Sequence, residues 1–178
     1  MRFTVLILVL FGGLAIAQAQ SYRHFTLSVG VNAIENNDGE QTPTSSELDF
    51  RNPLYVNAEK RISRLFSVSA GTSLNKLELK DDSRRFFVDV EAGVNLFLDR
   101  LIWDNIDLEW TVGTGFGFYW LETYDGTVTY NLNSGFRYWF SDQFGVAIKG
   151  GAKVGFNDDD VVRNYYQYSL SLVWGILN

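Results

Sequence analysis

The sequence contains no cysteine among its 178 residues, only two prolines, one methionine and one histidine. The absence of cysteine excludes a disulfide framework, a thiolate metal site and a lipidated N-terminal cysteine. The scarcity of proline permits long uninterrupted strands, because proline cannot donate a hydrogen bond to a sheet ladder. A formal net charge of −6 argues against a protein that binds nucleic acid through its phosphates. Glycine (16 residues) and aromatics (16%) are abundant, as is typical of β-proteins.

The first twenty residues differ in character from the rest. Arg2 provides a positive start, residues 3–14 are nearly all apolar, and Ala17–Gln18–Ala19 has the small-x-small pattern of a cleavage site. These features predict a secretory signal peptide over residues 1–20 and a single β-barrel domain over residues 21–178. An uncleaved membrane anchor is the alternative, but the apolar run is short for a spanning helix.

Eight segments of the remaining chain alternate between apolar and polar residues. Each is near or above the roughly 9–11 residues that a tilted strand needs to cross a bilayer. Connections alternate between short and more polar ones, so we expect both termini at the end that carries the short turns. No helical segment is expected after the first twenty residues. The predicted fold is an all-β, eight-stranded antiparallel up-and-down barrel, with strands at 25–33, 53–62, 65–79, 86–97, 106–121, 127–140, 144–156 and 161–176.

Alternation alone does not decide which face of such a barrel is inside. A soluble barrel of the lipocalin kind points its apolar face inward, whereas a transmembrane barrel points it into lipid and keeps a polar lumen. In residues 106–121, Trp110, Val112 and Phe116 share one face with Trp120, and glycines and carboxylates occupy the other. Across the chain the polar face is dominated by Gly, Ser, Asn and Thr, which fit the crowded interior of eight strands.

The charges on the polar face balance. Five acids and five bases share the predicted inward register, so their sum is zero, as a buried set of charges requires. A solvated face with the same balance is the alternative. The predicted lumen charge network consists of Glu59, Arg61, Asp89, Glu91, Asp107, Glu109, Arg137, Lys149, Lys153 and Arg163.

Aromatic residues of the apolar face gather toward the strand ends, and the middles are mostly aliphatic. Two aromatic girdles around an aliphatic band match the two interfaces of a membrane, whereas a soluble core has no reason to sort its aromatics this way. The transmembrane barrel is therefore favoured over the soluble one. The predicted lipid-facing girdle consists of Phe25, Phe66, Phe118, Trp120, Phe140, Phe144, Phe156, Tyr166 and Trp174.

With its signal peptide, alternation and strand–turn–strand segments such as Tyr138-Trp-Phe-Ser-Asp-Gln-Phe-Gly145, the chain resembles small eight-stranded outer-membrane β-barrel proteins of Gram-negative bacteria. It is most similar to the outer membrane protein β-barrel domain, or porin-like, family of the Bacteroidetes type. The resemblance covers residues 21–178 and implies a cell-envelope protein in the outer membrane with both termini periplasmic. It also implies contact with outer-membrane lipids and lipopolysaccharide, and with the barrel-assembly machinery during biogenesis. A monomer is expected.

The residues indicate no catalytic centre. His24 lies on the expected inward register, but Ser28 is four residues away along the strand, too far for a hydrogen bond to it. We therefore expect no catalysis, cofactor, metal ion or nucleic acid, and a structural or surface-interaction role. A small transport barrel for a hydrophobic or ionic solute is the first alternative, although eight strands leave no continuous channel once side chains fill them. An outer-membrane lipid-modifying enzyme is the second.

Overall fold

The computed structural model describes residues 23–36, 53–78, 84–103, 107–122, 126–156 and 164–177; the predicted signal peptide lies outside these residues. Eight strands and one short helix make up the described chain. Strand boundaries differ from the predicted ones by up to three residues, with the largest differences in the first and last strands. The elements are β1 (Arg23–Asn36), β2 (Leu54–Arg61), β3 (Phe66–Glu78), β4 (Arg84–Phe97), α2 (Asp99–Ile102), β5 (Leu108–Leu121), β6 (Thr127–Trp139), β7 (Phe144–Gly155) and β8 (Asn164–Leu177).

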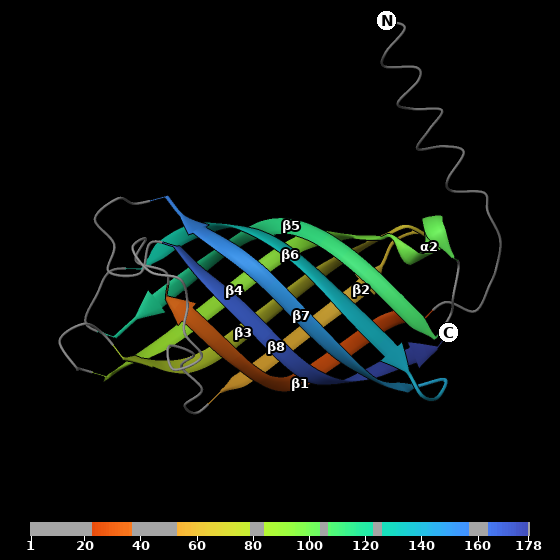
Figure 1. Ribbon diagram of the computed structural model, residues 1–178, viewed down its shortest axis with the longest axis horizontal. Helices are drawn as coiled ribbons and strands as arrows, with labels where there is room; N and C mark the ends of the chain where they lie inside the picture. Colours follow the sequence, from red (N-terminus) through yellow and green to blue (C-terminus); the bar gives the residue numbers. More distant parts are fainter. Residues whose placement is uncertain are drawn as a thin grey trace, which may run out of the picture.

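The strands form a closed barrel in sequence order, and every neighbouring pair is antiparallel. The first and last strands, β1 and β8, pair with each other and close the barrel, with a register that runs from Phe25 opposite Ile176 to Asn36 opposite Tyr165. The start of β1, the end of β8 and α2 lie at one end of the barrel, which we call the α2 end (Figure 1). The opposite end is called the loop end. The predicted all-β, up-and-down fold is confirmed.

The expectation of no helix after residue 20 is wrong at one place. The link after β4 contains α2, a single turn in which the Trp103 N–H donates to the Asp99 carbonyl at 2.9 Å. Four residues are too few to produce a visible helical periodicity in a sequence, which is why the pattern does not reveal this turn. Among the described residues, no helix is long and apolar enough to cross a membrane.

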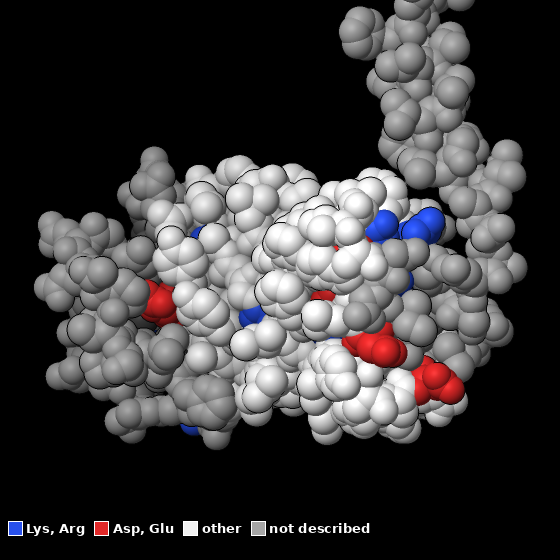
Figure 2. All heavy atoms as spheres, turned by 45° about the vertical axis from the view of Figure 1, so that its right-hand side comes forward, with Lys and Arg blue, Asp and Glu red and all other residues white. Residues whose placement is uncertain are grey.

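The two faces of the sheet differ sharply in exposure. Along β8, Leu170, Leu172 and Trp174 are exposed, whereas Ser171 and Val173 between them are buried. A similar alternation holds in the other strands: most exposed side chains are large and apolar, and the inside holds small polar and charged side chains together with a few large aromatic ones. The face drawn in Figure 2 is correspondingly white over most of its wall, with charged side chains gathered mainly toward the α2 end.

Two of the glycines on the inward face allow neighbouring strands to approach closely. Gly93 in β4 lies directly opposite Gly115 in β5. A methyl group on Gly115 would run into the carbonyl of Ala92, and one on Gly93 would run into the carbonyl of Thr114. Backbone atoms cannot swing aside as a side-chain end can, so both positions favour glycine.

The loop end of the lumen is filled by an apolar layer. It contains six buried side chains from β1, β3, β4, β5 and β8, and the ring of Phe87 lies at its centre. Phe87 stacks on Tyr119 with centroids 5.4 Å apart and meets Tyr165 edge-on at 5.5 Å. We define this apolar layer as Ile34, Leu77, Phe87, Tyr119, Leu121 and Tyr165.

Replacing Phe87 by leucine is expected to lower the free energy of unfolding by about 1–2 kcal/mol, because it removes two aromatic contacts from a site with no exposed surface. Urea unfolding of the barrel in lipid bilayers measures this. The matched control is Phe118→Leu on the outer face, where the side chain is 44% exposed and is predicted to face lipid, so a change near zero is expected. A larger loss at Phe118 than at Phe87 would contradict the assignment of the two faces.

Candidate functional site in the barrel interior

Most charged side chains inside the described barrel fall into two separate groups. The first, which we call the arginine cluster, lies at the α2 end and contains Glu59, Arg61, Asp99, Arg100, Glu109 and Arg137. The second, the lysine cluster, lies nearer the loop end and contains Asp89, Glu91, Lys149 and Lys153. Three acids balance three bases in the first and two balance two in the second, so each cluster is neutral by itself.

Glu109 is the centre of the arginine cluster. Its Oε1 accepts from Arg61 at 2.9 Å and from Arg100 at 3.4 Å, and its Oε2 accepts from Arg137 at 3.0 Å. Arg137 also donates to Glu59 at 2.8 Å, which links β6 to β2 across the lumen. Since these side chains come from β2, β5, β6 and the α2 link, the cluster ties distant parts of the wall together.

Arg61 and Arg137 also lie against aromatic rings. The Arg61 guanidinium carbon lies 3.6 Å from the ring centroid of Phe97, and that of Arg137 lies 5.6 Å from Trp139. Such cation–π contacts stabilise a guanidinium that has lost its water. The aromatic rings and the ion pairs together fill the lumen at the α2 end.

Asp99 and Arg100 are the members of this cluster that the sequence pattern misses. They belong to the link after β4, and a period of two assigns no inward side to residues outside a strand. In the structure the Arg100 Nε lies 3.1 Å from an Asp99 carboxylate oxygen, and the Trp110 N–H donates to Asp99 at 3.1 Å. Burial raises the pKa of the Asp99 carboxyl, against the opposing influence of the Trp110 N–H and Arg100.

The lysine cluster is bridged by two ammonium groups from β7. Lys149 lies 2.8 Å from Glu91, and Lys153 contacts both Asp89 and Glu91, the latter at 2.9 Å. The Tyr165 hydroxyl donates to Asp89 at 3.2 Å and so joins the cluster to the apolar layer. The lysine cluster and the apolar layer therefore lie next to each other and fill the lumen toward the loop end.

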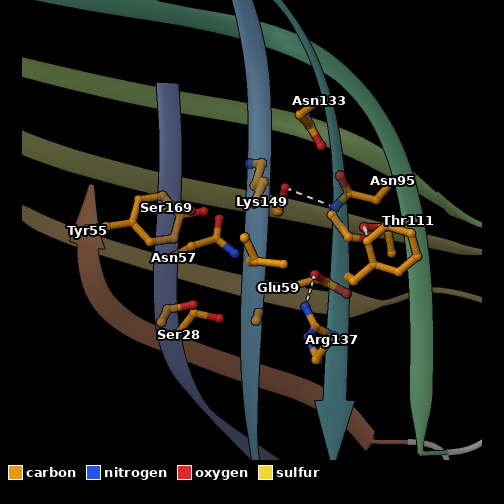
Figure 3. A pocket seen from close by; sticks show the side chains of 16 residues that line it. Ser28, Tyr55, Asn57, Glu59, Asn95, Thr111, Asn133, Arg137, Lys149 and Ser169 are labelled. Atoms are coloured by element: carbon orange, nitrogen blue, oxygen red, sulfur yellow. Dashed lines mark hydrogen bonds and ion pairs between the residues drawn. The ribbon is translucent and has the colours of Figure 1, made fainter. Parts of the chain in front are cut away.

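A small polar chamber separates the two clusters (Figure 3). Its volume is ≈ 40 Å³, which is room for about three water molecules. Arg137 and Glu59 bound it on one side, and Lys149 with Tyr55 on the other. Its wall is made of small polar side chains from seven strands: Ser28, Asn57, Ser69, Asn95, Thr111, Asn133, Ser169 and Ser171.

The structure brings eight of the ten residues of the predicted charge network into these two clusters. Asp107 is not inside: it is exposed just before β5, where its backbone carbonyl accepts the Trp139 N–H. The alternating pattern predicts a strand from residue 106, but the strand begins at Leu108, so the inward register does not reach Asp107. Arg163 lies outside the described residues.

The nine predicted girdle residues all lie on the outward face, at the ends of their strands or beside them. Eight of them are exposed and Phe66 is partly covered. Outward aromatics also occur away from the ends, as with Phe116, whose ring meets that of Tyr130 at 5.7 Å. Lipid contact by the nine remains a prediction.

Histidine and carboxylate side chains are the candidate groups for catalysis or metal binding in the described residues. His24, expected on the inward register, is exposed at the start of β1, where the register with β8 shifts between Arg23 and Phe25. Ser28, four residues along the strand, is buried, and no hydrogen bond to His24 is found among the described residues. No group of three or more His, Asp or Glu side chains in the described chain is arranged to hold a metal ion.

No protein-family model matches the sequence, and no curated protein matches it. Solved structures do match the fold. The chain is similar to Neisserial surface protein A (TM-score 0.65, 7% identity), with 89% of this chain and 100% of that chain covered. It is also similar to the N-terminal β-barrel domain of Pseudomonas aeruginosa OprF (TM-score 0.59, 7% identity), with 88% of this chain and 100% of that chain covered. A third similar structure is the outer membrane protein OprG from Pseudomonas aeruginosa (TM-score 0.56, 9% identity), with 85% of this chain and 95% of that chain covered.

At these identities the likeness establishes the fold, an eight-stranded transmembrane β-barrel, and no activity. A de novo designed transmembrane β-barrel has a similar structure too (TM-score 0.50, 14% identity, 89% and 100% covered). The architecture therefore exists without an evolved ligand or reaction, and any function of this chain has to be argued from its own interior and surface.

Proposed function

We propose that the chain is an integral outer-membrane β-barrel protein with a structural or surface-interaction role and no catalysis. The observation that carries the proposal is the filled interior, in which two neutral ion-paired clusters and an apolar layer occupy the lumen on either side of a chamber of ≈ 40 Å³. A lumen in which the charges pair with one another favours stability of the wall over passage of a solute.

The location follows from the outward apolar face and the predicted signal peptide. Residues 1–20 direct export, and the barrel then enters the outer membrane through the barrel-assembly machinery, as a monomer of the Bacteroidetes-type family. Its α2 end, with both termini, faces the periplasm, because short turns lie on that side of bacterial barrels. Outer-membrane lipids and lipopolysaccharide surround the exposed aromatic and aliphatic side chains.

Purified protein inserted into planar bilayers is expected to show no stepwise conductance, because both charge clusters and the apolar layer lie across the lumen. Heat-modifiable electrophoretic mobility of the same preparation verifies that the barrel is folded. Reproducible conductance steps from folded protein would contradict the proposed role and favour the small transport barrel. Recovery of the native protein as a soluble periplasmic species would contradict the membrane location.

A deletion strain separates the remaining roles. The structural role predicts altered envelope integrity with unchanged lipid A and phospholipid profiles. A changed lipid profile would instead favour an outer-membrane lipid-modifying enzyme. In that case His24→Ala would test the one histidine of the chain.

A further inference from the structure

The link between β4 and β5 straddles the rim of the barrel. Asp99 and Arg100 point to the interior and are 0% and 6% exposed. The next three residues are large and apolar, yet Leu101 is 60% exposed, Ile102 61% and Trp103 43%. We call Leu101, Ile102 and Trp103 the rim triad. Arg100 is buried and its neighbour Leu101 is exposed within one helical turn, so the link has an inner and an outer side.

The inner side is held by polar contacts. Arg100 pairs with Glu109 at 3.4 Å and with Asp99 at 3.1 Å, and the Trp110 N–H donates to Asp99 at 3.1 Å. These contacts fix the rotation of α2 about its axis. With Arg100 turned into the lumen, the rim triad must project away from it and carries no charge of its own.

The outer side is continuous with the lipid-facing wall. The Trp103 ring stacks on Trp110 with centroids 6.0 Å apart and planes at 10°, and Trp110 stacks on Phe136 at 5.6 Å and 14°. The Trp110 indole N–H donates to the Ser134 hydroxyl at 3.1 Å, so its polar atom is satisfied within the protein. Trp110 and Phe136 belong to the outward apolar face, and the stack extends that face onto the link.

We propose that the rim triad docks on the bilayer itself, at the boundary between headgroups and acyl chains of the leaflet at the α2 end. Exposure of three large apolar side chains to water is unfavourable, and tryptophan is suited to this boundary because its ring is apolar and its N–H is polar. Ile62 and Phe140, in the two neighbouring turns of the same rim, are exposed apolar residues as well. The link is thus an interfacial anchor whose inner side belongs to the arginine cluster.

The proposal rests on the membrane location proposed above, and three single-cysteine variants test the two separately. The chain has no cysteine, so each variant carries one nitroxide label at a known position. Ile102→Cys reports on the rim triad, Val94→Cys on the exposed outer face of β4, and Gln143→Cys on the exposed β6–β7 turn. Each labelled protein is placed in phospholipid nanodiscs, and collision rates with oxygen and with a water-soluble nickel complex are measured.

We expect the oxygen-to-nickel collision ratio at residue 102 to exceed that at residue 143 severalfold and to approach that at residue 94. A ratio at 102 equal to that at 143, with 94 shielded from nickel, would overturn the anchor and leave the proposed location intact. Equal, water-like ratios at all three positions would overturn the location and the anchor together. Heat-modifiable mobility verifies folding, and Leu101→Cys repeats the measurement if Ile102→Cys fails to fold.

Discussion

Val112→Arg is expected to abolish accumulation of the folded barrel in membranes. Val112 lies on the outward face of β5, beside Phe66 and Leu96, in a groove whose lining is mainly apolar. An arginine there would place a charge on the apolar outward wall, where an Arg or Lys costs up to about 2–4 kcal/mol, the most at the bilayer midplane. The loss is measured as the disappearance of the heat-modifiable folded band from membrane extracts.

Gly113→Ser is the matched control one residue along the same strand. A side chain at Gly113 points inward and meets the amide ends of Asn95 and Asn133, both of which can swing toward the central chamber. We expect this variant to assemble with at most a modest loss of folded protein. If the two variants are equally defective, the inward and outward faces of β5 have been assigned the wrong way round.

Glu109→Gln is expected to lower the free energy of unfolding by about 3–5 kcal/mol, since removing one partner leaves buried charge uncompensated. Three guanidinium groups, those of Arg61, Arg100 and Arg137, contact this carboxylate, and only Glu59 and Asp99 remain to balance them. Urea unfolding in bilayers of defined lipid measures the change. The further variant Arg61→Gln, made in the Glu109→Gln background, restores neutrality and is expected to recover part of the loss.

Asp107→Asn tests whether Asp107 lies at the surface, as in the structure, or in the lumen, as alternation predicts. Alternation places Asp107 and Glu109 together in the lumen, whereas the structure buries only Glu109 and leaves Asp107 exposed. A surface substitution of this kind changes the free energy of unfolding by about 0.5 kcal/mol or less. A loss at Asp107 as large as that at Glu109 would show that both carboxylates face the lumen.

Residues within the strands were predictable because their side chains obey a period of two. Once the face carrying Trp110 and Val112 is assigned outward, the side of Glu109 or Lys149 follows from counting along the strand. Counting fails where the strand ends. Asp107 lies one residue before β5, and His24 lies beside a register shift, so both were assigned inward and are exposed.

The sequence by itself determined the number, order and approximate limits of the strands, and the balance of charge on their polar face. These are local properties, set by alternation and by polar breaks in the chain. Only the tertiary structure decided which charges meet: Arg137 reaches Glu59, 78 positions away, and Lys149 reaches Glu91, 58 positions away. Partners across a lumen depend on how the closed barrel brings distant strands opposite one another. For the same reason, only the structure showed that Arg100 turns from a short link into the arginine cluster and leaves an uncharged rim outside.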